Sequence, residues 1–288
     1  MTQNDQKVKN LKLTPQVLEL NWGNVAERIK NFIRDYVEKA DAEGIVLGIS
    51  GGVDSSTAAA ISALAIGGKR VLGLIMPEEE TYNPKDVEDA KRVAEKFGIK
   101  TEIIDLSNIL KAFYNAIPNF NEQDRVSKGN IKARTRMICI YYYANAQNRI
   151  VVGSSDKSET MMGYFTKWGD VAADISPLMD LYKTQVRKLA LHIGVPKEIA
   201  LKPSTPALWP NQTAEKELGM KYEILDLILY GLERFMSPQE IANQLNLPVK
   251  TVEEIKARWI ANEHKRRMPL TVKIQYRTPS ADFRLPRT

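Results

Sequence analysis

The segment from Gly48 to Ser56, with the sequence GISGGVDSS, combines glycines, serines and one aspartate directly after a short apolar run. Glycines after a buried strand let the chain turn tightly and point successive N–H groups at one spot, and the next helix adds its free amides and positive dipole end. Such a turn suits a phosphate group. The spacing differs from the Walker A pattern, because no lysine precedes the serines, and also from G-x-G-x-x-G. For the two glycines alone, the alternative is an ordinary turn in which Ser55 or Ser56 only caps the helix.

Asp54 stands at the end of this turn, where its charge would repel a phosphate group unless a divalent cation lay between the two. Magnesium suits such a place, since proteins commonly bind it through one or two carboxylates together with phosphate oxygens of the substrate. The loop therefore predicts that a nucleotide binds together with Mg²⁺.

The elements that must position this loop alternate regularly along the chain. Apolar runs without a polar alternation, which are typical of buried parallel strands, occupy residues 45–49, 69–76, 100–106 and 149–155. Helical patterns occupy residues 21–39, 57–65, 83–98 and 130–148. This alternation predicts an α/β fold with a doubly wound parallel sheet and helices on both faces. Loops at the carboxyl ends of such strands surround one crevice.

The second half of the chain has a different pattern. Residues 156–176 are polar and interrupted by glycines, and a connection of this length without periodicity is expected to be a functional lid. From Leu181 onward we expect only helices, packed beside the sheet, and no return of the sheet. We divide the chain into an N-terminal extension, residues 1–20, and a single domain, residues 21–288.

The composition excludes several kinds of site. A single cysteine, Cys139, cannot form an internal disulfide, and together with only two histidines it cannot supply the usual four ligands of a structural zinc ion. The net charge of +6 favours anionic partners without separating nucleic acid from nucleotides. No apolar signal segment or membrane span is visible, so we expect a cytoplasmic protein that binds no membrane.

Four stretches carry a resemblance to a known family. SGGVDSS resembles the pyrophosphate loop of the N-type ATP pyrophosphatases, which cleave ATP between its α and β phosphates and transfer AMP to a substrate. Within that group, the stretches GNIKARTRM (129–137), GSSDKSETMMGYFTKWGD (153–170) and EHKRRMP (263–269) resemble those of ammonia-dependent NAD synthetases. The resemblance extends roughly from residue 24 to residue 269 and implies an adenine nucleotide alpha hydrolase-like fold.

The resemblance also implies the reaction. Family members amidate nicotinate adenine dinucleotide (deamido-NAD) to NAD, with ATP as co-substrate, Mg²⁺ as cofactor and ammonia as the nitrogen source, and they release AMP and pyrophosphate. A carboxylate is a poor electrophile, because its negative charge repels nucleophiles and its leaving group would be oxide. An acyl adenylate removes that charge and departs as AMP, so a ligase of this kind can form the C–N bond. The resemblance further implies a symmetric homodimer.

The functional residues that the resemblance implies fall into four sets. The ATP-binding set is Gly48, Ile49, Ser50, Gly51, Gly52, Val53, Asp54, Ser55, Ser154, Lys183 and Thr205. The metal ligands are Asp54 and Glu159. The substrate-binding set is Arg134, Lys167, Asp174, His264 and Lys265. The catalytic set is Asp54, Asp170 and Lys183, in which Asp170 handles ammonia by attracting ammonium and assisting its deprotonation.

Two departures from the family pattern affect the loops of the site. Relatives carry glycine after the residue that corresponds to Asp170, whereas this chain has Val171 and Ala172. A β-branched valine is strained at positive φ, so either the loop takes another path or its closure differs. Relatives also often have an acid where Ala207 stands, so one contact is expected to be missing.

Three alternatives remain beside the interpretation of the chain as an NAD synthetase. One is another ATP pyrophosphatase, such as a GMP synthetase subunit, and a second is a sensor that binds the nucleotide without turnover. The third interprets Tyr141, Tyr142 and Tyr143 as a base-stacking platform, but three consecutive helical residues point in three directions, and we expect no nucleic-acid partner.

The source of ammonia is a separate question. Cys139 lies within a helix, where burial raises a thiol pKa, and there is no room for a glutaminase domain. We therefore expect the protein to use free ammonia or a separate partner that supplies it.

Overall fold

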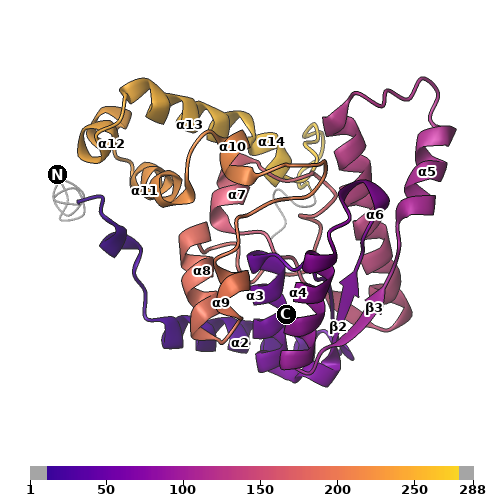
Figure 1. The fold of residues 1–288 in the computed structure, drawn as a ribbon. Coiled ribbons are helices and arrows are strands. Elements are labelled where there is room, and N and C mark those ends of the chain that lie inside the picture. Colours follow the sequence, from indigo (N-terminus) through magenta and orange to yellow (C-terminus); the bar gives the residue numbers. More distant parts are fainter. Residues whose placement is uncertain (1–11, 279–288) are drawn as a thin grey trace.

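The computed structural model describes residues 12–278, and a four-stranded parallel sheet lies at its centre (Figure 1). The strand order is β3-β2-β1-β4, and Val46 in β1 pairs with Leu72 on one side and Val151 on the other. The strand bounds are β1 Gly44–Gly48, β2 Val71–Ile75, β3 Lys100–Ile103 and β4 Arg149–Val151. This order confirms the predicted doubly wound sheet, since the chain moves outward from β1 to β3 and then crosses to the other side of β1.

Helices cover both faces of the sheet because the side chains of each strand alternate. Ile45 and Leu47 join one core, and Val46 between them joins another. The first core is shared with α2 (Trp22–Lys39), α3 (Val53–Ile66), α4 (Pro84–Lys96), α8 (Lys183–His192) and α9 (Lys197–Ala200). The opposite face packs against α6 (Arg125–Ala146), which is preceded by α5 (Ser107–Ala116).

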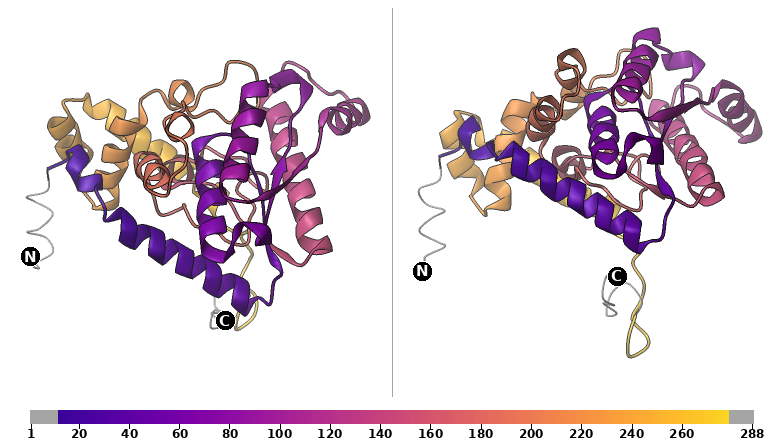
Figure 2. Two further views of the ribbon diagram at one scale, coloured as in Figure 1. Left: turned by 60° about the horizontal axis from the view of Figure 1, so that its bottom comes forward. Right: turned by 90° about the horizontal axis from the view of Figure 1, so that it is seen from below.

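A third core lies beside the sheet in a layer of C-terminal helices (Figure 1). Leu13 and Leu18, from the segment before α2, are buried in this layer, and α2 runs from there toward the sheet (Figure 2). The layer comprises α7 (Lys157–Met162), α10 (Ala214–Leu218), α11 (Tyr222–Glu233), α12 (Pro238–Leu245), α13 (Val249–Ala261) and α14 (Glu263–Arg266), together with the 3-10 turn Pro15–Leu18. The helices expected after Leu181 are thereby confirmed. The domain division stays an interpretation, with residues 1–11 and 279–288 outside the described part.

Several predicted bounds differ from the structure. α6 begins at Arg125, five residues before the predicted start, because the Asp124 side chain accepts a hydrogen bond from the Ser127 N–H and caps the helix there. Helix α5 was not predicted at all. Residues 156–176 contain helix α7, and Ile175 near their end forms a parallel bridge with Val152, whereas no strand follows Leu181 in the described part of the chain, as expected. A six-residue helix is too short to show a periodic pattern.

In residues 12–278, no helix has both the length and the apolar character that crossing a membrane requires.

Gly51 is the residue that shapes the turn after β1. Its φ is +78°, and a Cβ atom there would lie 2.3 Å from the backbone oxygen of Asp86 at the start of α4. Gly67, at the other end of α3, has a similar φ of +88°, but a Cβ atom there would meet nothing within 4 Å. Both glycines therefore have a positive φ, but another backbone segment approaches closely at Gly51 and not at Gly67.

We expect Gly51→Ala to destabilise the protein more than Gly67→Ala does. Both variants force an alanine into left-handed backbone at a cost of roughly 1–2 kcal/mol, but only Gly51→Ala must also displace α4. Urea unfolding of both variants and the wild type measures the difference. Equal losses of unfolding free energy would mean that the Asp86 contact places no constraint on the loop.

Candidate active site

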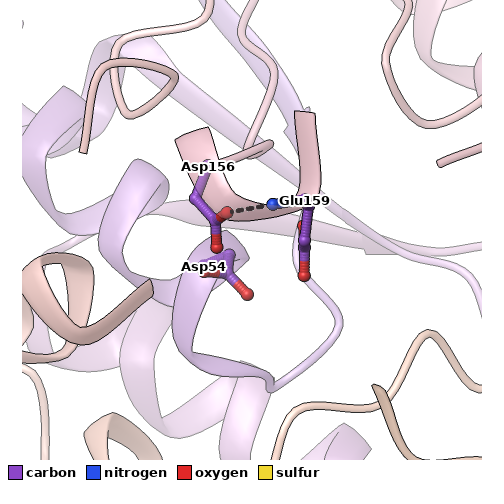
Figure 3. Close-up of side chains that lie close together, drawn as sticks. All are labelled: Asp54, Asp156 and Glu159. Carbon is purple, nitrogen blue, oxygen red and sulfur yellow. Dashed lines mark hydrogen bonds between the residues drawn. The ribbon is translucent and has the colours of Figure 1, made fainter. Parts of the chain in front are cut away.

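Three carboxylates meet where β1 and β4 end (Figure 3). Asp54 lies in the first turn of α3, whereas Asp156 and Glu159 belong to α7 and its N-terminal cap. One oxygen from each lies within 4.8 Å of the others. Neighbouring parallel strands from which the chain departs in opposite directions leave a crevice at their carboxyl ends. The strand order therefore explains why residues more than a hundred positions apart form one acidic cluster.

The side chain of Lys183 forms ion pairs with all three acids of this cluster. Its Nζ atom lies 2.5 Å from Asp54 Oδ2, 2.7 Å from Asp156 Oδ2 and 2.8 Å from Glu159 Oε1, and the side chain is fully buried. Burial alone would lower the pKa of Lys183, but the three carboxylates outweigh it and raise that pKa well above its ordinary value. Lys183 therefore stays charged.

The cluster still carries more negative than positive charge. Burial raises the pKa of Glu159 well above its ordinary value and also raises the pKa of Asp156, with neighbouring carboxylates adding to the effect. Asp54 Oδ1 is buried and has no hydrogen-bond partner among the described residues. Carboxylate oxygens are the ligands that Mg²⁺ prefers, and a divalent cation would neutralise the excess charge. The residues present therefore fit this metal.

Asp156 was missed in the sequence analysis. Its side chain accepts a hydrogen bond of 2.8 Å from the Glu159 N–H and so caps α7 (Figure 3). The pattern D-x-x-E directly after a strand is a helix-start signal, which could have placed both acids at the strand end. A capping role explains the residue locally, but only the fold shows that its other oxygen faces Lys183.

A cavity of about 590 Å³ opens above the acidic cluster. Its size is in the range of small-molecule sites. The wall includes Glu78 and Thr81 after β2 and the segment from Lys202 to Trp209. The predicted site residues that line it are Gly48, Ile49, Ser50, Gly52, Val53, Asp54, Ser55, Ser154, Glu159, Asp170, Thr205 and Lys265. The predicted residues outside this lining are Gly51, Lys183, Arg134, Lys167, Asp174 and His264.

The serines of the loop after β1 bond to one another rather than to the helix end. Ser55 Oγ accepts a hydrogen bond from the Ser50 N–H at 3.1 Å and lies 2.9 Å from Ser50 Oγ. The N-cap of α3 is Gly52, which has no side chain to satisfy the first amides. The alternative interpretation, in which Ser55 or Ser56 only caps the helix, is therefore wrong. The free amides at the N-terminus of α3 stay available to an anion.

The predicted substrate-binding residues from the chain's two halves lie together at one edge of the cavity. Arg134 Nη2 donates to the Lys167 carbonyl at 3.2 Å, and Lys167 Nζ donates to the His264 carbonyl at 2.7 Å. Lys265 Nζ donates to the Gly163 carbonyl and lies 4.6 Å from the centroid of the Phe165 ring. The structure thus brings Arg134, Lys167, His264 and Lys265 together.

The two aspartates of the following loop have different surroundings. Asp170 lines the cavity and accepts a hydrogen bond of 2.8 Å from the Thr166 N–H, and the surrounding protein raises its pKa by desolvation. Asp174 is exposed, and its Oδ2 accepts a hydrogen bond of 2.8 Å from the N–H of Val151 in β4. Its role as a substrate contact stays a prediction.

The backbone of this loop shows whether Val171 is strained. Val171 and Ala172 have ordinary negative φ, and the left-handed residue in this loop is Trp168, with a φ of +62°. The loop therefore takes another path, in which the valine is not strained. Ala207 itself is left-handed, with a φ of +47°, and its backbone bonds to the side chains of Thr205 and Thr81.

Arg136 is a second residue that the sequence analysis missed. It lines the cavity, and the described residues offer its guanidinium no hydrogen bond or ion pair, although Glu78 and Asp170 lie near enough to favour its charge. Ala133, Arg136, Met137 and Ile140 line the cavity from one face of α6. This spacing of three, one and three residues is helical, so the periodicity of α6 could have placed Arg136, rather than Arg134, inside.

We expect Lys183→Met to make stability strongly dependent on pH. The pKa values of Asp156 and Glu159 in the folded protein are already raised, and a raised carboxyl pKa means that stability is lost as pH rises through it. Without the ammonium both values rise further, so the variant should lose roughly 3–5 kcal/mol at neutral pH and regain part of it near pH 5. Urea unfolding at about pH 5 and pH 8 measures this slope.

The matched control is Lys188→Met on the same helix, because Lys188 is partly exposed and, among residues 12–278, pairs with Glu19 alone at the surface. It should cost less than about 1 kcal/mol at either pH. A Lys183→Met variant with the pH slope of the control would contradict the charge balance described above.

The chain matches the NAD synthase family over residues 25–269. It is 48% identical over 255 residues to the NH(3)-dependent NAD(+) synthetase of Hyperthermus butylicus, covering 88% of this chain and 92% of that protein. It is 50% identical over 259 residues to the NH(3)-dependent NAD(+) synthetase of Methanocaldococcus jannaschii, covering 88% of this chain and 99% of that protein. Among solved structures, it is similar to an NMN synthetase from Francisella tularensis, with a TM-score of 0.79, 34% identity and coverage of 89% of this chain and 100% of that one.

Proposed function

The chain belongs to the NAD synthase family, and from this premise we propose that it amidates deamido-NAD to NAD, using ATP and ammonia and releasing AMP and pyrophosphate. The observation that carries the proposal is the acidic cluster of Asp54, Asp156 and Glu159, of which Asp54 and Glu159 line a cavity that the loop after β1 also lines. An anion-binding loop and a set of cation ligands in one cavity suit a nucleoside triphosphate with its metal.

The loop from Gly48 to Ser55 would hold the departing pyrophosphate. Its free amides at the start of α3 and the hydroxyls of Ser50 and Ser55 are donors placed where negative charge develops when the bond between the α and β phosphates breaks. Mg²⁺, held by Asp54 and Glu159 with Asp156 beside them, would neutralise part of the triphosphate charge. Lys183 would keep the three acids at their positions when the cation leaves.

The nitrogen step needs a base inside the cavity. Ammonium predominates at neutral pH, and its charge is attracted by the carboxylate of Asp170. The side chain of Asp170 is exposed toward the cavity, yet desolvation raises its pKa, which makes the carboxylate a better proton acceptor than an aspartate with an ordinary pKa. Free ammonia would then attack the acyl adenylate, and AMP would leave. Cys139 is no competing nucleophile, since burial raises its thiol pKa.

The remaining predicted contacts concern the dinucleotide and stay proposals. Ser154 and Thr205 line the cavity, where each would offer a hydroxyl to ATP. The group of Arg134, Lys167, His264 and Lys265 lies at the cavity edge and offers cations and a ring to the phosphates of deamido-NAD. A sensor that only binds nucleotide would not require a cluster of three acids, one of them fully buried, because their desolvation is costly. The cytoplasmic location stays a prediction.

A second candidate is the amidation of nicotinate mononucleotide, because the similar structure from Francisella tularensis is that of an NMN synthetase. The adenylation chemistry is the same, since both substrates carry the nicotinate carboxylate. They differ in the adenylate half, which only the dinucleotide can place against the edge group of Arg134 and Lys167.

We expect purified protein with ATP, Mg²⁺, ammonium and deamido-NAD to form NAD, AMP and pyrophosphate, because the cavity combines the phosphate loop with the metal ligands. Chromatography of the nucleotides measures the products, with nicotinate mononucleotide as the competing substrate. Asp54→Asn should lower the rate by a factor of roughly 100 or more, whereas Asp180→Asn, whose side chain is 97% exposed, should leave it unchanged. Formation of ADP, or a preference for the mononucleotide, would contradict the proposal.

We also propose that two copies form a homodimer through α5 and α6. Apolar side chains are exposed along these helices, among them Phe113, Ile138 and Tyr142. Tyr141 and Tyr143 pack toward the sheet, so only the middle tyrosine of the three faces outward. An uncovered apolar face of this kind is typical of a subunit interface.

Sedimentation of the wild type should give about twice the chain mass of 32.5 kDa. Ile138→Glu together with Tyr142→Glu should give a monomer, because the two positions are one helical turn apart and the added charges would face the partner. Ile260→Glu, at an equally exposed isoleucine on α13, is the control and should stay dimeric. A wild type that sediments as a monomer would overturn the proposed dimer.

A further inference from the structure

Asp226 is an acid in the middle of an otherwise apolar stretch of α11, and no part of it reaches solvent. Its neighbours Leu225, Leu227 and Ile228 belong to the core of the C-terminal layer. Burying a carboxylate in such surroundings is costly unless hydrogen-bond donors satisfy its oxygens. No salt bridge joins Asp226 to another residue in the described part of the chain, so hydrogen bonds must provide the compensation.

Three donors surround this carboxylate, and they come from two other helices. Ser158 Oγ, in α7, donates to Oδ1 at 2.6 Å. The N–H and the Oγ1 of Thr184, in α8, donate to Oδ2 at 2.9 Å and 2.7 Å. Asp226 therefore ties the first turns of α7 and α8 to α11.

Ser158 also links the two helix starts directly. Its Oγ accepts a hydrogen bond of 2.9 Å from the Lys183 N–H. Since the single hydroxyl proton points at Asp226, the lone pairs are left to face Lys183. The carboxylate thus fixes the orientation of the hydroxyl, and the hydroxyl in turn fixes the backbone of Lys183.

The residues next to these anchors are members of the acidic cluster. Glu159 follows Ser158, Lys183 precedes Thr184, and their side chains meet at 2.8 Å. Helix α7 has only six residues, and an isolated helix of that length is not stable in water. Its position relative to α8 must therefore be set by contacts from outside, and Asp226 supplies them from the helical layer.

We propose that Asp226 is a positioning residue that holds Glu159 and Lys183 in register with Asp54 and Asp156, and thereby sets the affinity of the site for the metal and its nucleotide. Asp226 is absent from the cavity wall, so it acts only through Ser158 and Thr184. The inference rests on the proposed function in one respect, namely that a divalent cation and ATP occupy the acidic end of the cavity.

Asp226→Asn in the full chain tests the proposal. The asparagine amide replaces one accepting oxygen by a donor, so in either orientation a donor faces Ser158 or Thr184. We expect calorimetric titration with ATP and Mg²⁺ to show binding weakened about tenfold to 100-fold, and NAD formation to require correspondingly more Mg²⁺. The KM for deamido-NAD should change less than about twofold. A variant with a cooperative unfolding transition and wild-type affinity for ATP and Mg²⁺ would overturn the proposal.

Ser158→Ala and Thr184→Val provide a second test that leaves the carboxylate in place. Each removes one hydroxyl of the network, and each should weaken ATP and Mg²⁺ binding in the same direction as Asp226→Asn. The matched control is Ser62→Ala, because Ser62 is fully buried in α3 and its hydroxyl has no hydrogen-bond partner among residues 12–278. If both network variants bound ATP and Mg²⁺ as the control does, the proposal would fail even where Asp226→Asn does not fold.

The two proposals can fail separately. A wild type that binds ATP with Mg²⁺ but forms no NAD would refute the proposed function. The role of Asp226 would still be tested by comparing the ATP and Mg²⁺ affinities of Asp226→Asn, Ser158→Ala and the control.

Discussion

The ammonium of Lys183 among three carboxylates is the interaction on which the rest of the site depends. Asp54 comes from the sheet layer, and Asp156 and Glu159 come from the start of α7, so the contacts at 2.5–2.8 Å join two parts of the molecule that have separate cores. One buried cation faces three acids, and the pKa of Glu159 is raised by burial first and then by the neighbouring carboxylates of Asp156 and Asp54. Lys183 thus offsets part of the negative charge of this cluster, and a divalent cation would offset more of it.

The local features of the site could be predicted from the sequence. The strand, the turn at Gly51 and the start of α3 follow one another within a few residues, so their pattern is visible without a fold. Glu159 was found by resemblance to a family. The alternation of strands and helices predicted the sheet because each βα unit is defined by contiguous residues.

The features that were missed depend on contacts between distant segments. The role of Asp156 requires the position of Lys183, and the orientation of Arg136 requires knowledge of which face of α6 covers the cavity. Asp226 is an isolated acid among leucines, a pattern that signals a buried polar contact without naming its partner. Lys183 shows the converse, because its predicted contact with a phosphate stays a prediction, whereas its ion pairs with three acids become visible only in the structure.

The segment that precedes α2 gives the fold an unusual order of assembly. Leu13 and Leu18 complete the core of the C-terminal helices, and the Leu13 N–H bonds to Gln244, which lies 231 positions later in the chain. On a translating ribosome this segment therefore emerges first but must wait for α12 before it can dock. The sheet and its covering helices can close early, whereas the segment from Leu13 to Leu18 and the C-terminal helical layer complete their shared core late.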